Sequence, residues 1–339
     1  MPTDPQETLA ILRHNTGFDD PTIWIDYARS HGFKRVKAVA ITRCPDCAAE
    51  PDCSRGQYVY YSTLIHLLQC ARCGLIWANA HIDPELVRSH FEVAYKDDAY
   101  FRDSRRAIFE HLAAVIDDLA PEAARVLDVG GARGDLMHQA ARRRPDLHVT
   151  VQDISEAATD AAEERFGFAT LRGDARLLAS HAEQYDVAVL SDVLYYEPDL
   201  RLLWSALSRL VRPGGSIVIR IPNKFPLVRI GQRWFELVRT ARRQLLQTRV
   251  AFHNPEHIFI FRQRYLRARL RAIGFTGVAV APSPVLSTSM PGAARSAYFQ
   301  LARAVSRLSP GGLVLTPSML VVGRSKRPVD PVQEEPPTR

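Results

Sequence analysis

The feature that most constrains the fold is a glycine-rich turn directly after an apolar strand. Residues 126–135 read VLDVGGARGD, so a short aliphatic run leads into three glycines and then a helix-forming stretch. Glycine lets the backbone turn tightly and approach a ligand that any side chain would exclude. The pattern predicts a parallel α/β sheet with a ligand at the carboxyl end of this strand.

Strands and helices alternate from this point onward. Apolar runs predict strands at 125–129, 148–152, 168–171, 185–190, 215–221, 277–281 and 318–323. Apolar residues at helical spacing predict helices at 104–119, 134–143, 156–165, 200–210 and 294–308. This alternation favours a Rossmann-like α/β fold, in which one seven-stranded sheet carries helices on both faces.

Acidic residues follow or end the first strands of this sheet. Asp128 precedes the glycine turn, where a carboxylate would repel a pyrophosphate but suit a cationic ligand, which argues against NAD. Asp153 ends the second strand and can accept the two hydroxyls of a ribose. Asp174 follows the third strand and can receive the exocyclic amine of an adenine. Asp153 and Asp174 can each equally cap a helix, and that alternative stays open.

The series of turn and acids resembles the class I S-adenosylmethionine-dependent methyltransferases over roughly residues 104–324. In that family the glycine turn holds the methionine end of S-adenosylmethionine, the second-strand acid binds ribose and the third-strand acid contacts adenine. Ala132 departs from the family, since many members have a glycine there. The resemblance implies cofactor-binding roles for Asp128, Gly130, Gly131, Gly134, Asp153, Ile154, Asp174, Ala175, Ser191 and Asp192.

All five cysteines lie within residues 44–73. Two C-x2-C pairs, Cys44 with Cys47 and Cys70 with Cys73, are separated by 22 residues and predict one tetrahedral Zn²⁺ site. Four thiolates close such a site, so the zinc is expected to be structural. Cys53 is left as a free thiol, and a redox pair or unbound thiols remain the alternative. The segment 41–101 resembles the zinc-binding part that precedes methyltransferase domains acting on sugars and secondary metabolites.

Histidines are the best candidates for a catalytic base because their intrinsic pKa lies near neutrality. The candidates are His253, Glu256 and His257. The last two resemble the Glu-His step of sugar C-methyltransferases, although Asn254 stands where that family has a tyrosine. His257 can instead anchor the following strand or helix, so the catalytic assignment and the kind of methylated atom stay open.

The domain organisation follows from these segments. The prediction comprises an N-terminal segment (1–40), the zinc ribbon (41–85), a helical connector (86–120), the methyltransferase domain (121–325) with helical lid insertions at 223–256 and 287–312, and a disordered tail (326–339). The chain starts without a secretory pattern and lacks the roughly 18 consecutive apolar residues of a membrane span, so a cytoplasmic location is expected.

The net charge of +7 is concentrated in one segment, because residues 224–249 carry one Lys, six Arg and one Glu, a sum of +6. This basic amphipathic stretch can meet a membrane surface or a lipid-linked substrate, or simply pack on the sheet. The leading hypothesis is methyl transfer to a small-molecule acceptor, such as a sugar, nucleotide-sugar, lipid-linked saccharide or natural product.

Two other functions remain as alternatives. One is an RNA methyltransferase that uses the ribbon and the arginine-rich insertion. The ribbon is a poor nucleic-acid surface, since residues 44–73 carry two arginines against three acids, a net charge of −1. The other is a non-catalytic protein that binds S-adenosylmethionine, which the intact acids at 128, 153 and 174 disfavour.

Overall fold

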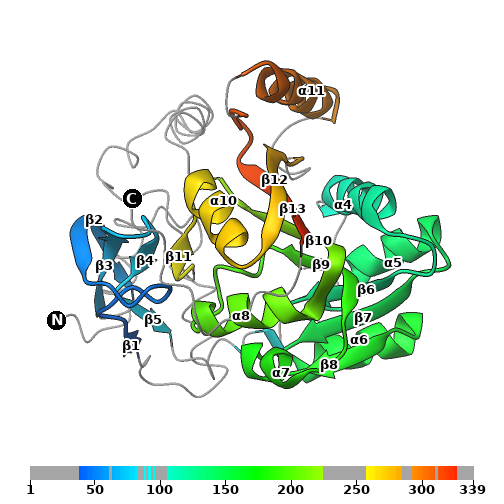
Figure 1. The fold of residues 1–339 in the computed structure, drawn as a ribbon, viewed down its shortest axis with the longest axis horizontal. Coiled ribbons are helices and arrows are strands. Elements are labelled where there is room, and N and C mark those ends of the chain that lie inside the picture. The colour runs from blue at the N-terminus through cyan, green and yellow to red at the C-terminus, as the bar shows by residue number, and fades with distance from the viewer. Residues whose placement is uncertain are drawn as a thin grey trace. The chain divides into compact units, whose positions relative to one another are not determined.

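A computed structural model of the chain describes residues 38–60, 63–82, 88, 91–92, 95, 105–223, 257–284, 292–309 and 312–326. These residues form two compact units (Figure 1). The first unit contains residues 38–82 together with 257–260, and the second contains 91–223 together with 261–326. Within these ranges, no helix combines the length and the apolar character that a membrane span requires.

The second unit is built on one seven-stranded sheet. Its strands are β6 (Arg125–Val129), β7 (His148–Asp153), β8 (Ala169–Arg172), β9 (Tyr185–Ser191), β10 (Val211–Pro222), β12 (Phe275–Pro282) and β13 (Ser318–Ser325). Their spatial order is β12-β13-β10-β9-β6-β7-β8. The five strands from β10 to β8 run parallel, whereas β13 is antiparallel to both β10 and β12. The predicted Rossmann-like sheet of seven strands is confirmed.

Helices cover both faces of this sheet. They are α4 (Arg106–Leu119), α5 (Asp135–Arg143), α6 (Glu156–Phe166), α7 (Ala175–Ser180), α8 (Leu200–Leu210), α10 (Gln263–Ala272) and α11 (Gly292–Leu308). Two of them, α7 and α10, were not among the predicted helices. Residues 212–215, whose Pro-Gly-Gly sequence predicts a turn, lie inside β10, where the register with β9 shifts between Val211 and Ser216.

Burial on both faces of the sheet explains why its central strands are mostly apolar. Side chains alternate between the faces of a strand, and in β9 both sets are buried, including Val187 and Val189 on one face and Ala188 and Leu190 on the other. On the first face, the buried stripe of α4, which includes Ile108, packs with helix α5 against the strands. Burying an aliphatic side chain of this size contributes about 1.5–3 kcal/mol.

The first unit contains a small antiparallel sheet that is assembled from distant parts of the chain. Its order is β11 (Phe259–Ile260), β4 (Ile76–Ala78), β3 (Thr63–Cys70) and β2 (Pro51–Tyr60), and a second sheet pairs β1 (Ala38–Ala40) with β5 (Ala80–Ile82). Phe259 lies opposite Trp77, and the Ala78 N–H donates to the Ile258 carbonyl at 2.8 Å. The segment predicted as the ribbon, 41–85, lacks β11, which follows the basic insertion.

Several predicted features lie outside the described residues. They are the N-terminal segment up to residue 37, the insertion from 224 to 256, most of the connector before residue 105, and the tail from 327. The side chain of Cys53 also lies outside the described part of the chain.

Candidate functional site

The glycine turn after β6 leaves no room for side chains. A Cβ atom on Gly130, whose φ is +64°, would lie 2.4 Å from Cγ2 of Val193. A Cβ atom on Gly131 would lie 2.7 Å from Oδ2 of Asp128. Ala132 follows with φ at 50°, in the left-handed region, so this non-glycine residue adopts a conformation that L-residues disfavour. The sequence needs glycine at 130 and 131 because real Cβ atoms do not approach so closely.

Asp128 is a buried carboxylate for which the described residues offer no partner. Its side chain is 1% exposed, and among the described residues neither of its oxygens has a hydrogen-bond partner. Burial, together with the nearby Asp153 carboxylate, raises the pKa of Asp128 to about 8. An unpaired charge in a dry site is costly unless a cation compensates it. The arrangement therefore fits a positively charged ligand beside the glycine turn.

Asp153, at the end of β7, shapes the turn itself. Its Oδ2 accepts a hydrogen bond from the Ala132 N–H at 2.9 Å, and its Oδ1 accepts one from the Ser155 N–H at 3.0 Å. Burial raises the pKa of Asp153 to about 6, and these backbone hydrogen bonds, with one from Ile154, oppose that rise. Each carboxylate oxygen has a second lone pair, so the group can hold the turn and still accept from hydroxyls.

Asp174 is a helix cap, as one of the sequence interpretations expects. Its Oδ1 accepts from the Arg176 N–H at 2.9 Å, and Ala175 begins α7 as a buried residue. The side chain of Asp174 is only half-buried. The capping role does not test the predicted contact with adenine, since a carboxylate can accept several hydrogen bonds.

Gln152 forms hydrogen bonds with the loops after β6 and β8, and it was not among the residues predicted from the sequence. Its Oε1 accepts from the Gly130 N–H at 3.1 Å, and its amide donates to the Gly173 carbonyl. The Gly131 N–H donates to the Gln152 carbonyl at 3.0 Å. The available signal was an amide next to Asp153 at the end of a strand, because a buried amide needs partners.

Glu92, from the connector, closes the start of helix α6. Its two carboxylate oxygens accept from the backbone N–H groups of Glu156 at 2.6 Å and Ala157 at 3.1 Å. Helix N-termini attract anions because their first N–H groups lack intrahelical partners. The neighbouring Phe91 ring stacks on Tyr95 at 5.2 Å and meets the edge of Tyr196 at 5.7 Å. This contact brings the connector to the loop after β9.

Arg220 organises the ends of β9, β10 and β13. It is 4% exposed and forms an ion pair with Asp192, whose φ of 59° turns the chain after β9. Its Nε donates to the Ser283 hydroxyl at 2.8 Å and its Nη2 to the Ser318 hydroxyl at 3.1 Å. The sequence signal was an arginine within the apolar run 217–221. Asp192 was predicted as a cofactor ligand; the structure shows its ion pair with Arg220, and the cofactor role stays a prediction.

The three predicted catalytic residues do not lie with the predicted cofactor residues in the part of the chain that the structure describes. His253 and Glu256 lie outside the described residues. His257 is buried, 7% exposed, and belongs to the first unit, directly before Ile258 and β11. The predicted cofactor residues all belong to the second unit. The position of His257 agrees with the anchoring interpretation, in which it fixes the start of the next strand.

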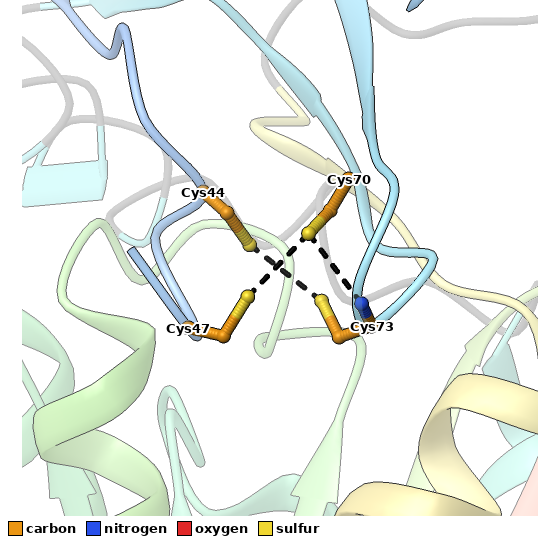
Figure 2. Close-up of side chains that lie close together, drawn as sticks. All are labelled: Cys44, Cys47, Cys70 and Cys73. Atoms are coloured by element: carbon orange, nitrogen blue, oxygen red, sulfur yellow. Dashed lines mark hydrogen bonds between the residues drawn. The ribbon is translucent and has the colours of Figure 1, made fainter. Parts of the chain in front are cut away.

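The four paired cysteines converge in the first unit, as Figure 2 shows. Their sulfur atoms all lie within 4.8 Å of one another. Cys44 Sγ lies 3.6 Å from Cys73 Sγ, and Cys47 Sγ lies 3.4 Å from Cys70 Sγ. These separations far exceed a disulfide bond of about 2.05 Å. They approach the edge of about 3.8 Å that follows for a tetrahedron with Zn–S bonds of about 2.3 Å.

The backbone around the second cysteine pair also supports a metal site. The Cys73 N–H donates to Cys70 Sγ at 3.4 Å, and Gly74 follows with φ at 74°. Cys44 and Cys70 are buried at 3% and 0% exposure. Hydrogen bonding among the thiols lowers the pKa of Cys47 and raises the pKa of both Cys44 and Cys73. The four side chains fit a metal site of the all-thiolate kind.

Comparison with known proteins decides the family. Residues 100–280, more than half of the chain, match the family model described as a methyltransferase domain. The chain belongs to this family. At the level of this domain, the predicted class of S-adenosylmethionine-dependent methyltransferases is confirmed.

Curated relatives match shorter stretches. The chain is 30% identical over 122 residues to a ubiquinone/menaquinone biosynthesis C-methyltransferase from Dinoroseobacter shibae, covering 32% of this chain and 49% of that protein. It is 33% identical over 104 residues to a trans-aconitate 2-methyltransferase from Variovorax paradoxus, covering 30% of this chain and 40% of that protein. The chain thus spans about half or less of the length of these relatives.

One solved structure gives a looser likeness. A SAM-dependent methyltransferase from Archaeoglobus fulgidus is 18% identical, with a TM-score of 0.45. The match covers 67% of this chain and 97% of that one.

Proposed function

We propose that the protein transfers the methyl group of S-adenosylmethionine to a small-molecule acceptor. The observation that carries this proposal is Asp128, a buried carboxylate without a partner among the described residues, beside a turn that only glycine can form. A sulfonium nucleoside with a free ammonium group supplies the positive charge that such a site lacks. A pyrophosphate would place negative charge there.

Residues from successive strand ends would hold this donor. The glycine turn and Asp128 suit its methionine end, Asp153 with Ile154 suits its ribose, and Asp174 with Ala175 suits its adenine. Ser191, which ends β9, and Asp192, which follows it, complete the residues proposed to bind the donor. When bound, the donor supplies an electrophilic methyl group.

The acceptor class remains the one indicated by the sequence: a sugar, nucleotide-sugar, lipid-linked saccharide or natural product. The matched relatives support a small acceptor, since they include C- and O-methyltransferases of quinone biosynthesis and a trans-aconitate methyltransferase. Those names describe the relatives, and their matches cover about a third of this chain.

Calorimetry with the purified protein tests the donor. We expect S-adenosylmethionine to bind and NAD to give no heat, because Asp128 repels a pyrophosphate. An Asp153→Ala variant should lose the affinity, whereas an Asp146→Ala variant is the control, since Asp146 pairs with Arg144 at the opposite edge of the sheet. Binding of NAD in preference to S-adenosylmethionine would refute the proposal.

A screen of candidate acceptors tests the reaction. Each acceptor is incubated with the protein and donor labelled in the methyl group, and the products are read by mass spectrometry. Transfer to a saccharide or natural product would support the proposal. Transfer only to RNA, or binding of the donor without any transfer, would favour the two alternative functions.

The cysteine cluster is proposed to hold one structural Zn²⁺. Four thiolates leave no open coordination position for a substrate, so the ion would act through folding. Metal analysis should return one zinc ion per chain, and a Cys70→Ser variant should lose it together with stability of the first unit. A Cys53→Ser variant is the matched control. A wild-type protein that is fully folded without metal would contradict this assignment.

A further inference from the structure

We infer that His111 is the base that takes a proton from a hydroxyl or amine acceptor. This inference rests on the proposed function and deepens it by naming the class of nucleophile and the residue that serves it. None of the sequence candidates for the base was this histidine. The case stands on where His111 lies, which groups surround it and what its free nitrogen atom can do.

His111 lies on α4 and contacts α11. The buried stripe of α4 includes Ile108 and Leu112, and His111 flanks that stripe as a half-buried residue. Its ring meets the edge of Phe299 on α11, with ring centroids 5.5 Å apart and planes at 81°. Two helices that are far apart in the sequence therefore fix the position of the imidazole.

The Nε2 atom of His111 is buried, and none of the residues that the structure describes offers it a hydrogen bond. A buried polar nitrogen without a partner is costly, and most such atoms in proteins are satisfied. A ligand that donates a hydrogen bond to Nε2 would remove this cost. A hydroxyl or an amine is such a ligand.

The surroundings keep the imidazole neutral. Burial lowers the pKa of His111, and the guanidinium groups of Arg303 on α11 and Arg220 on β10 lower it further. Those two arginines are the charged groups that act on His111 from the elements packed against it. A neutral imidazole accepts protons, whereas an imidazolium cannot.

The register of the sheet places Arg220 at the ligand edge. Arg220 lies opposite Ser191, at the carboxyl end of β9, and pairs with Asp192 in the next loop. Tyr195 follows in that loop, where burial and the nearby Asp192 carboxylate raise its pKa well above the usual value. The guanidinium of Arg220 also lowers the pKa of His111, and open α/β sheets bind ligands at these strand ends.

The chemistry balances without a further reactant. The acceptor oxygen or nitrogen gives a lone pair to the methyl carbon as the carbon–sulfur bond breaks and its electron pair returns to sulfur. The acceptor proton passes to Nε2 of His111, which becomes an imidazolium and later releases the proton to water. General base catalysis of this kind contributes roughly 100- to 10,000-fold in rate.

The first experiment measures protonation without any acceptor. In protein labelled with ¹⁵N-histidine, NMR titration should show His111 still neutral at pH 6.5, with its signals assigned by their loss in His111→Gln. Arg303→Gln should shift the His111 pKa upward, because a nearby cation is removed. Arg307→Gln, one turn further along α11, should leave it unchanged. A His111 pKa at or above 6.5 in the wild type would overturn the inference.

The second experiment uses an acceptor that the labelled-donor screen identifies. His111→Gln should lower kcat roughly 100-fold or more and abolish the acidic limb of the pH profile. Its dissociation constant for S-adenosylmethionine should stay within about twofold, so loss of folding is separated from loss of the base. The matched control is His181→Gln, a half-buried histidine that bonds Tyr185 at the amino end of β9 and should leave kcat unchanged.

The outcomes separate the two proposals. A wild-type protein that transfers no methyl group to any acceptor contradicts the proposed function. An active wild type whose kcat and pH profile survive in His111→Gln overturns the role of His111 alone.

Discussion

Two buried charges near the same edge of the sheet are treated in opposite ways. Arg220 is paired with Asp192 and donates to the hydroxyls of Ser283 and Ser318. Asp128, four strand residues into β6, has no hydrogen-bond partner in the described part of the chain. A buried charge with a full set of partners holds the structure together, whereas one without partners is costly until a ligand arrives. The comparison separates a structural arginine from the carboxylate that we propose binds the donor.

The largest effect should come from removing the paired charge. Arg220→Met should destabilise the protein by about 3 kcal/mol, because it leaves Asp192 without its partner and two hydroxyls without a donor. Urea denaturation measures this change. Adding Asp192→Asn should restore part of the loss, and Arg176→Met, at an exposed position, is the control. An Arg220→Met protein of unchanged stability would remove the structural half of the comparison.

Removing the charge of Asp128 should change stability in the opposite direction, because the described residues give that carboxylate no partner. Asp128→Asn should weaken S-adenosylmethionine binding roughly tenfold to a hundredfold, the range for a hydrogen bond to a charged group. The same variant should melt several degrees higher than wild type at pH 8 without ligand, because it removes an uncompensated carboxylate. Calorimetry and thermal melts check the two halves. A lower melting temperature with unchanged affinity would mean that Asp128 is structural.

The pH dependence should follow from the raised carboxyl pKa values. Burial raises the pKa of Asp128 to about 8 and that of Asp153 to about 6, so the folded protein binds more protons than the unfolded chain above about pH 4. These two groups should therefore lower the stability of the ligand-free protein as pH rises from about 4 to 8. Denaturation at a series of pH values measures this trend, and Asp128→Asn should flatten its upper half.

The smallest effect concerns Asp174, whose carboxylate is expected both to cap α7 and to bind the donor. Asp174→Ala should cost about 1 kcal/mol of stability, the usual contribution of a helix cap. Asp199→Ala is the matched control, because Asp199 caps α8 through the Leu202 N–H at 3.0 Å. Only Asp174→Ala should also weaken donor binding. Equal behaviour of the two variants in calorimetry would leave Asp174 with the capping role alone.

Local patterns in the sequence were sufficient for much of the fold. The apolar run before Gly130, the strand–helix alternation and the cysteine spacing each depend on residues that are close in the chain, and the sheet and the cysteine cluster follow them. The contacts that sequence reasoning missed join distant segments. Glu92 reaches the start of α6 some 64 residues later, and β11 completes a sheet that begins before residue 60.

The sequence by itself determined the backbone of the cofactor edge, since glycine at 130 and 131 and acids at 128 and 153 admit few other arrangements. It also determined the four thiols of the cysteine cluster. Only the tertiary structure decided which buried charges found partners. Arg220 and Asp128 both interrupt apolar strands, and nothing in their local sequence says that one is paired and the other is not. Pairing depends on groups brought together by the sheet, and the contact of His111 with Phe299 on α11 likewise joins distant segments.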